Sequence, residues 1–269
     1  MALFKRNPFG HILFIKKNLI RIFGVLTHRR YHGFNQLQIE GSEIIKKLPH
    51  TNVLFISNHQ TYFADVVAMF HVFNASLSGR QDSIKNLGYL WQPKLNLYYV
   101  AAKETMQAGI LPRIMGYVGA ITVERTWRSK GKDVTEKREI NPNDTENIKI
   151  ALADGWVITF PQGTTKSFKP VRKGTAHIIK QHKPIVVPIV IDGFRRSFDK
   201  KGLRTKKKGI LQSFIIKEPL VIDYENESIE AIVEKVEYAI EQHQSFLKVI
   251  PAEEIETQKE LNRLRKWDY

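Results

Sequence analysis

The 269-residue sequence contains no cysteine. Disulfides, cysteine-ligated metal sites and a thiol nucleophile are therefore excluded, and the composition suits a reducing compartment. The sequence also lacks an apolar run of the roughly 18 residues that cross a bilayer. Its N-terminal apolar stretch is interrupted by Lys16, Lys17 and Arg21 and leads to no small-residue cleavage site, so we expect no signal peptide. The nine histidines form no zinc-ligand spacing, so we expect no metal site and no resident cofactor.

Acidic residues are scarce compared with basic ones. The chain has 27 aspartates and glutamates against 42 lysines and arginines, which gives a formal net charge of +15 at pH 7. A charge of this size favours an anionic partner, and nucleic acid and anionic lipid both satisfy it. No RNA-binding signature, zinc finger or glycine-rich phosphate loop is present. We therefore expect an anionic membrane surface as the partner, and no nucleic acid.

Residues 9–28 carry apolar side chains at a spacing of three and four, which predicts an amphipathic helix. The apolar stripe consists of Ile12, Ile15, Leu19, Ile22, Phe23 and Leu26. The positive charges around it come from Lys16, Lys17, Arg21, Arg29 and Arg30. Such a helix can lie in the plane of a membrane interface, and it can also pack against the rest of the protein. We divide the chain into a basic membrane-associating segment (1–34), a main domain (35–250) and a charged helical tail (251–269).

The middle of the chain alternates apolar strand-like runs with helical spacings. We expect strands at residues 53–56, 98–102, 120–123, 156–160, 185–191, 210–216 and 220–222. We expect helices at residues 62–72, 104–117 with an interruption near Pro112, 145–153 and 174–181, and from residue 228 onwards. Strands joined by helical crossovers predict an α/β fold with a mostly parallel sheet covered by helices.

After Ser57, Asn58 and His59 follow the first of these strands, and Asp65 comes six positions after His59. A neutral imidazole can take a proton from a substrate hydroxyl near neutral pH, and a carboxylate can fix its tautomer and stabilise the imidazolium. Side chains six residues apart do not share a helix face, so this pair has to meet across a turn. A histidine at a strand end is also a common structural group. Three blocks further along the chain favour the catalytic interpretation.

These blocks are residues 119–125 (GAITVER), 160–164 (FPQGT) and 186–189 (VVPI). In this order after Asn58 and His59, they resemble the motifs of the glycerolipid acyltransferase family, whose best-known members are the 1-acylglycerol-3-phosphate acyltransferases. The resemblance covers roughly residues 35–222, so it implies that the main domain is an acyltransferase domain.

The resemblance implies transfer of a fatty acyl group from acyl-CoA or an acyl-carrier protein to a hydroxyl of a lysolipid. The leading acceptor is lysophosphatidic acid, which would give phosphatidic acid. The resemblance also implies a peripheral, monotopic position at the cytoplasmic face of the cell membrane. His59 would be the general base, Asp65 its orienting partner, and Arg125 the group that binds the acceptor phosphate. Further substrate-binding positions that it implies are Asn58, Lys103, Gln162, Gly163, Thr164 and Lys166.

The chain departs from the family pattern in three places, and these leave the acceptor open. One additional residue separates His59 from Asp65. Gln162 stands where the family usually has glutamate, and Thr165 where it usually has arginine, although Lys166 follows and would supply a cation. A lyso-aminolipid, such as a lyso-ornithine or lyso-glycine lipid, is therefore an alternative acceptor. A non-catalytic basic membrane or nucleic-acid binder would also fit the charge, but it would leave the His59 motif unexplained.

Residues 195–208 form a run dense in lysine and arginine, with Asp199 as its only acid. Such a run can contact anionic headgroups or the phosphates of coenzyme A or an acidic carrier protein, each basic residue near a membrane contributing about 1 kcal/mol. A solvated loop is the other interpretation of this composition.

Overall fold

The computed structural model describes residues 4–107, 109–124, 128–129, 132–133 and 142–247. Arg125 and the predicted tail at 251–269 lie outside these residues. Within the described ranges, the main sheet has seven strands in the order β1-β9-β8-β2-β7-β3-β4. The strands are β1 (Gln36–Glu40), β2 (Val53–Ser57), β3 (Leu97–Ala102), β4 (Ala120–Val123), β7 (Trp156–Thr159), β8 (Ile185–Asp192) and β9 (Leu211–Ile216).

Neighbouring strands of this sheet are parallel, except β8 and β9, which run antiparallel. Parallel neighbours need crossover connections, and the intervening helices supply them. Only a short helix, α8 (Phe194–Ser197), and a loop separate β8 from β9, so this pair can reverse direction. The predicted mostly parallel α/β sheet is therefore confirmed. A separate antiparallel pair, β5 (Arg128–Ser129) with β6 (Lys132–Asp133), follows β4.

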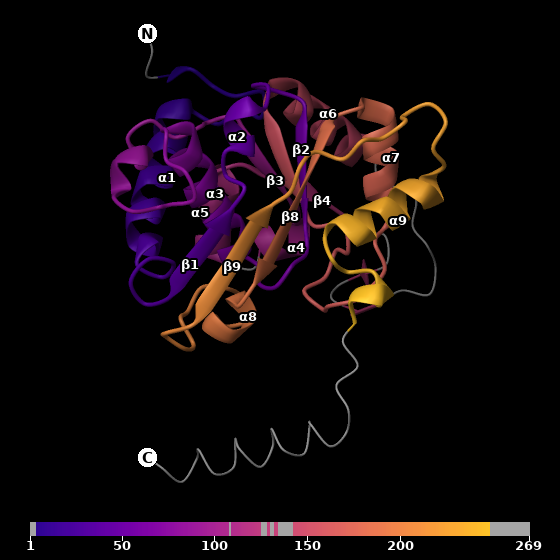
Figure 1. Ribbon diagram of the computed structural model, residues 1–269. Helices are drawn as coiled ribbons and strands as arrows, with labels where there is room; N and C mark the ends of the chain where they lie inside the picture. Colours follow the sequence, from indigo (N-terminus) through magenta and orange to yellow (C-terminus); the bar gives the residue numbers. More distant parts are fainter. Residues whose placement is uncertain (1–3, 108, 125–127, 130–131, 134–141, 248–269) are drawn as a thin grey trace, which may run out of the picture.

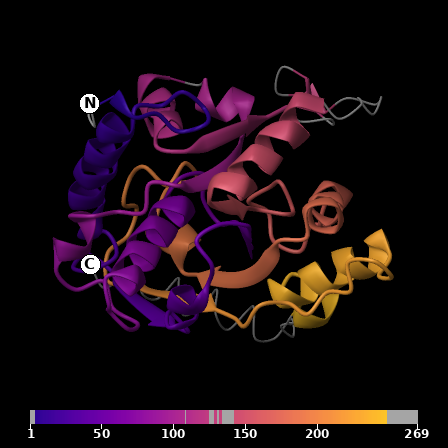
Figure 2. The same ribbon diagram turned by 90° about the horizontal axis from the view of Figure 1, so that it is seen from above.

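Helices cover both faces of the sheet (Figures 1 and 2). The face on the left of Figure 1 carries α1 (Leu13–His28), α2 (Ile44–Lys47), α3 (Ala64–Leu77) and α5 (Ile110–Tyr117). The opposite face carries α6 (Pro142–Asp154), α7 (Lys173–His182) and α9 (Ile229–Ala239). The shorter helical turns are α4 (Lys103–Met106), η2 (Leu87–Leu90) and η3 (Gln244–Phe246).

Each face of the sheet packs a hydrophobic core. Along β2, Val53 and Phe55 belong to the core under α1 and α3. The alternate residues, Leu54 and Ile56, belong to the core under α6, α7 and α9. Because β2 is central and buried on both faces, its sequence is a continuous apolar run rather than an alternating one. The carboxyl end of this strand leads directly into the turn that carries His59.

One local prediction was wrong, and another needs a small correction. Residues 220–222 form no strand; Leu220 lies beside β8 and its backbone N–H donates to Val186 O at 2.8 Å. The helical stretch at 104–117 is interrupted as predicted, although α4 ends at Met106 and α5 begins at Ile110, slightly before Pro112. Pro112 lies in the first turn of α5, where the amide that proline lacks would have no intrahelical partner in any case.

A helix forms in the predicted segment, as α1 (Leu13–His28), and none of its fully buried residues belongs to the apolar stripe. Ile20 and Gly24 are buried against the domain, and so is Lys16, which we expected at the surface. The Lys16 Nζ lies 3.3 Å from Leu97 O and 4.5 Å from the ring centroid of Tyr98. Burial lowers the pKa of Lys16 to about 7, because the interior disfavours the charged ammonium.

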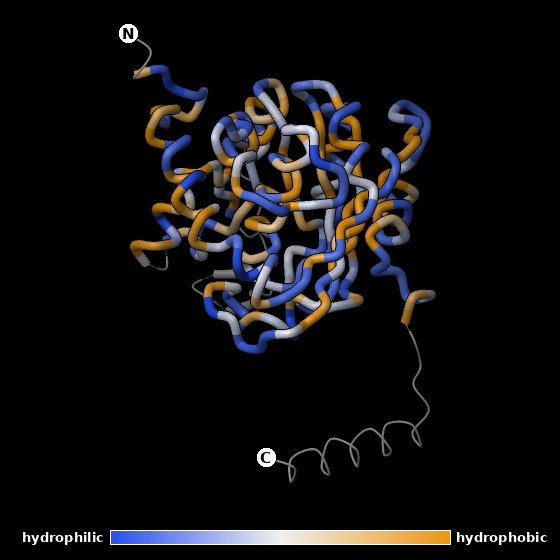
Figure 3. The backbone as a smooth tube through the Cα atoms, turned by 60° about the vertical axis from the view of Figure 1, so that its left-hand side comes forward, coloured by the Kyte–Doolittle hydropathy of each residue, from blue (hydrophilic) through white to orange (hydrophobic). Residues whose placement is uncertain are grey.

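The outer face of α1 is apolar. The large side chains exposed on it are Phe14, Ile15, Ile22, Val25 and Leu26. Figure 3 shows this helix at the edge of the molecule, with hydrophobic and hydrophilic stretches alternating along it. None of the helices in the described ranges is both long and apolar enough to cross a bilayer. Thus α1 packs on the domain by one side and presents apolar side chains on the other.

Candidate active site

His59 lies in the turn between β2 and α3. Its Nδ1 is 2.9 Å from Oδ2 of Asp65, which belongs to the first turn of α3. The two side chains therefore meet across the turn, as predicted from their spacing. The additional residue between them lies within this turn and does not separate them.

The Asp65 carboxylate is fully buried and is held by the turn itself. Oδ2 accepts the backbone N–H of Gln60 at 2.7 Å, and Oδ1 accepts the Thr61 hydroxyl at 2.6 Å. The backbone N–H of Thr61 also donates to Oδ2, at 3.0 Å. These donors stabilise the negative charge, and Asp65 in turn accepts the Nδ1–H of His59. The neutral His59 ring consequently carries its lone pair on Nε2.

The His59 ring stacks on Phe160, with ring centroids 3.9 Å apart and an interplanar angle of 20°. Its side chain is 13% exposed. The exposed part faces a cavity whose walls include Tyr62, Tyr99, Met106, Gly163, Thr164 and Thr165. With Nδ1 occupied by Asp65, Nε2 is the ring nitrogen available to a substrate in this cavity.

Asn58 and Gln60 join the turn to the end of β8. The Asn58 amide donates to Ile191 O and accepts from Ile191 N–H, both at 2.8 Å. Gln60 Nε2 donates to Ile191 O at 3.1 Å. Asn58, a predicted substrate-binding residue, is therefore buried, and the structure does not bring it to the cavity. Its contacts instead fix the backbone directly before His59.

The block at 160–164 ends β7 in a tight turn, in which the Gly163 N–H donates to Phe160 O at 2.9 Å. Gly163 has a φ of +63°, a left-handed value that glycine adopts without strain. The structure brings Gly163 and Thr164 to the cavity. Gln162 points away from it: the side chain is buried and donates to Lys169 O at 2.7 Å. Gln162 therefore braces the loop that follows the turn.

The predicted cationic residues are not gathered at the cavity. Lys103 forms an exposed ion pair with Glu124 at 2.8 Å. Lys166 is exposed on the loop after Thr164, and neither lysine lines the cavity. Arg125, the predicted phosphate ligand, lies outside the described residues.

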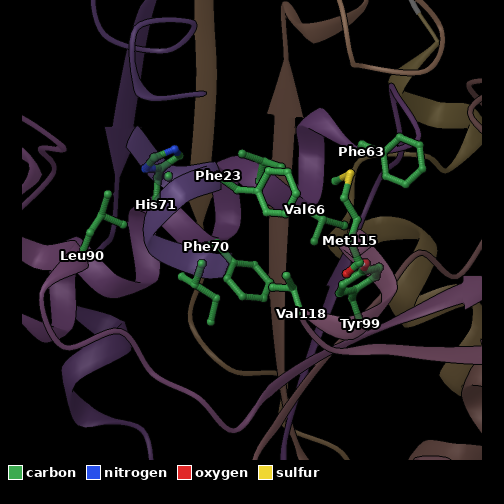
Figure 4. A pocket seen from close by; sticks show the side chains of 12 residues that line it. Phe23, Phe63, Val66, Phe70, His71, Leu90, Tyr99, Met115 and Val118 are labelled. Atoms are coloured by element: carbon green, nitrogen blue, oxygen red, sulfur yellow. Dashed lines mark hydrogen bonds between the residues drawn. The ribbon is translucent and has the colours of Figure 1, made fainter. Parts of the chain in front are cut away.

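A second, apolar pocket adjoins the His59 cavity (Figure 4). Val66 and Tyr99 contribute to the walls of both. From Tyr99 the pocket extends between α1, α3 and α5 towards His71 and Leu90, which lie at the far end in Figure 4. Gly24 of α1 lines it as well. No motif of the sequence pointed to this pocket, because its walls come from helices that only the fold brings together.

Among the described residues, His71 is the one titratable side chain at the far end of the apolar pocket. His71 is buried there, with Nε2 2.9 Å from the Thr27 hydroxyl and Nδ1 2.7 Å from the Tyr89 hydroxyl. Burial lowers the pKa of His71 to about 3, so its ring is neutral near pH 7. The described lining of the pocket therefore carries no charged side chain near pH 7.

This arrangement suits proton transfer on an amphipathic molecule. The His59 Nε2 can accept a proton from a hydroxyl in the cavity, while the adjoining pocket shelters an apolar chain from water. In the part of the chain that the structure describes, no three histidine, aspartate or glutamate side chains are grouped so that they could hold a metal ion.

Comparisons with known proteins indicate the family and the fold. A protein-family model described as Acyltransferase matches residues 36–192. Among solved structures, the fold is similar to the crystal structure of the 1-acyl-sn-glycerophosphate (LPA) acyltransferase PlsC from Thermotoga maritima, with a TM-score of 0.51 and 20% sequence identity. That similarity covers 88% of this chain and 81% of the other. No curated protein matches the chain significantly.

Proposed function

Since the chain belongs to the acyltransferase family, we propose that it transfers a fatty acyl group from acyl-CoA or an acyl-carrier protein to a hydroxyl of a lysolipid. The leading acceptor is lysophosphatidic acid, and the product is then phosphatidic acid. The observation that carries this proposal is the His59–Asp65 pair, with Nδ1 and Oδ2 2.9 Å apart, in which His59 lines a cavity that adjoins an apolar pocket.

In the proposed reaction, His59 Nε2 takes the proton of the acceptor hydroxyl as its oxygen attacks the thioester carbonyl carbon. A new C–O bond forms, the C–S bond breaks, and the proton on the imidazolium passes to the leaving sulfur to give a free thiol. Asp65 stabilises the imidazolium through its hydrogen bond to Nδ1–H. A positioned base of this kind contributes about 10²- to 10⁴-fold to the rate.

The apolar pocket supports a long-chain donor. With the thioester carbonyl beside His59, the transferred chain would pass Tyr99 and Val66, which line both the His59 cavity and the apolar pocket. It would then continue towards Leu90. A buried apolar chain is stabilised by about 0.8 kcal/mol per methylene. Donors with short acyl groups should therefore bind more weakly than palmitoyl donors.

The same proposal places the protein peripherally on an anionic membrane, at the cytoplasmic face. The exposed apolar side chains of α1 support an in-plane position of this helix. Trp91 is 71% exposed beside α1 and lies 4.6 Å from the Arg21 guanidinium, a pairing that suits the headgroup region. Because α1 also supplies Gly24 to the apolar pocket, a lipid chain would enter close to the bilayer.

The experiment is incubation of the purified protein with labelled palmitoyl-CoA and a panel of lysolipids, with the products identified by mass spectrometry. The panel contains lysophosphatidic acid and a lyso-ornithine lipid, so the assay also decides between these acceptors. We expect His59→Ala to abolish transfer with unchanged thermal unfolding. His50→Ala, which removes an exposed histidine, is the matched control and should retain activity.

Two outcomes would contradict the proposal. A wild-type protein that acylates none of the lysolipids would exclude the proposed reaction. A His59→Ala variant that keeps most of its turnover would exclude His59 as the base, even if the reaction itself is observed.

A further inference from the structure

Arg195 brings a guanidinium to the rim of the His59 cavity. The residue belongs to α8, directly after β8, and its side chain reaches across to the turns that carry the site. Nη1 donates to the Ser167 hydroxyl at 2.7 Å, and Nη2 donates to His59 O at 3.4 Å and to Thr165 O. Because His59 and Thr165 both line the cavity, the guanidinium lies at its edge.

The position of Arg195 relative to the base is fixed by the backbone. Its own N–H donates to Gln60 Oε1 at 3.1 Å, and the same Gln60 side chain donates to Ile191 O. The side-chain amide of Gln60, a residue of the His59 turn, thus forms hydrogen bonds to the end of β8 and to the start of α8. Arg195 therefore holds its place by the contacts that also position His59.

The charge of Arg195 is uncompensated in the part of the chain that the structure describes. The partners of its guanidinium are two carbonyl oxygens and a hydroxyl, all of them neutral. The next residue, Arg196, by contrast pairs with the carboxylate of Asp192 at 2.8 Å. A guanidinium has five N–H groups, so the three contacts of Arg195 leave donors for a further ligand. A cation held by neutral groups at the edge of a substrate cavity calls for an anion on the substrate.

We propose that Arg195 binds the anionic headgroup of the acceptor, a phosphate of the lysolipid, at the rim of the His59 cavity. This inference rests on the proposed acyl transfer. In a lysophosphatidic acid the free hydroxyl and the phosphate are on neighbouring carbons, so the phosphate has to lie within a few ångströms of the oxygen that His59 deprotonates. In a thioester donor, by contrast, the phosphates lie at the far end of the pantetheine arm, many bonds from the carbonyl that reacts. Charge-assisted hydrogen bonds to phosphate are among the stronger contacts of proteins.

The test compares a charged and an uncharged acceptor. KM and kcat are measured at saturating palmitoyl-CoA for lysophosphatidic acid and for monoacylglycerol, which lacks the phosphate. We expect Arg195→Gln to raise the KM for lysophosphatidic acid about 10- to 100-fold, with kcat changed less than the KM. The KM for monoacylglycerol should stay the same. Arg195→Lys should recover part of the loss, because it keeps the charge without the planar fork.

Arg196→Gln is the matched control, since it removes the neighbouring charge from the same short helix, and it should leave both acceptors unaffected. An equal loss with charged and uncharged acceptors would show that Arg195 only braces the turns, which contradicts the proposal. An increase confined to the donor KM contradicts it as well. Titration calorimetry with glycerol 3-phosphate tests the site without turnover: equal affinity in wild type and Arg195→Gln overturns the proposal whether or not the protein proves to be an acyltransferase.

Discussion

Asp65 is the residue on which the geometry of the His59 turn depends. Its buried carboxylate accepts hydrogen bonds from the His59 ring, from the backbone N–H of Gln60, and from both the backbone N–H and the hydroxyl of Thr61. The residue that lengthens this turn therefore adds backbone around the carboxylate instead of moving it away. An asparagine at this position would place its N–H₂ group, itself a donor, opposite donors that now bind the carboxylate.

We predict that Asp65→Asn lowers kcat by about 10²- to 10⁴-fold, because the ring would lose the partner that selects its tautomer and stabilises its charge. It should also lower the free energy of unfolding by about 1–3 kcal/mol, since buried donors of the turn would lose their acceptor. Steady-state kinetics and urea denaturation measure the two effects separately.

Thr61→Val is the control for Asp65→Asn, because it removes the 2.6 Å hydroxyl contact and leaves the carboxylate in place. It should reduce stability and keep kcat within a few-fold of wild type. A normal kcat in Asp65→Asn would mean that the carboxylate serves only the fold of the turn.

The sequence identified His59 and Asp65 because residue type and spacing define this pair. It did not reveal which strand-end side chains turn inward: Asn58 and Gln162 bind backbone groups instead of reaching the cavity. Nor did it single out Arg195, which is 136 positions from His59. That proximity follows from the pairing of β2 with β8, which a sequence pattern does not specify.

At the scale of elements, α1 shows how a small residue influences which side of a helix packs against the domain. Its periodicity predicted the helix, but the face that packs inward contains Gly24, Ile20 and Lys16 rather than the apolar stripe. A side chain at Gly24 would come within 2.6 Å of Leu90 Cδ1, so glycine is what lets α1 approach η2 closely. Ile15, Ile22 and Leu26 of the stripe are left exposed, whereas Phe23 lines the apolar pocket. The helical periodicity alone does not decide between exposure and burial of such residues.

We predict that Lys16→Met raises the free energy of unfolding by up to about 4 kcal/mol at pH 7. The pKa of Lys16 is about 7 in the folded protein and about 10.4 in the unfolded chain, and each unit of difference corresponds to about 1.4 kcal/mol. Wild-type stability should rise between pH 7 and about 10.4, because the unfolded chain binds the additional proton over that range and loses it above. The advantage of the variant should therefore shrink as the pH approaches 10.

Urea denaturation of wild type and Lys16→Met at pH 7 and pH 10 measures this difference. Lys17→Met, which alters a partly exposed neighbour on the same helix, is the control and should change stability little at either pH. A Lys16→Met variant less stable than wild type at pH 7 would show that the contact of Nζ with Leu97 O outweighs the cost of burial.

At the scale of the whole molecule, the alternating pattern predicted the α/β architecture and its mostly parallel sheet. The edge strand β1 was not predicted, because Gln36–Glu40 is short and only Ile39 is buried in it. The antiparallel β8–β9 pair was not predicted either, since strand direction depends on a connection whose path the composition of residues 195–208 does not determine. Both features depend on which strands pair and in which direction, and the composition of a segment does not determine this.

We predict that the protein binds phosphatidylglycerol vesicles through the outer face of α1. Ile22→Glu combined with Leu26→Glu should weaken binding at least about tenfold in vesicle flotation, because two exposed apolar side chains would become anionic. Leu211→Glu combined with Val221→Glu adds the same charge at two exposed positions elsewhere and should bind like wild type. If both double variants floated with the vesicles as wild type does, the membrane contact would lie on another surface.

The strand order has a consequence for how the chain is made. In the finished sheet Val53 of β2 is aligned with Trp156 and Ile185, and β1 is aligned with β9. On the ribosome, β2, which is wholly buried in the finished sheet, therefore emerges about a hundred residues before either of its neighbours exists. Pairings over such distances form slowly, and an unpaired apolar strand is prone to aggregate in the meantime. The central position that fixes His59 in the folded protein thus leaves β2 exposed without a partner while the chain is still being synthesised.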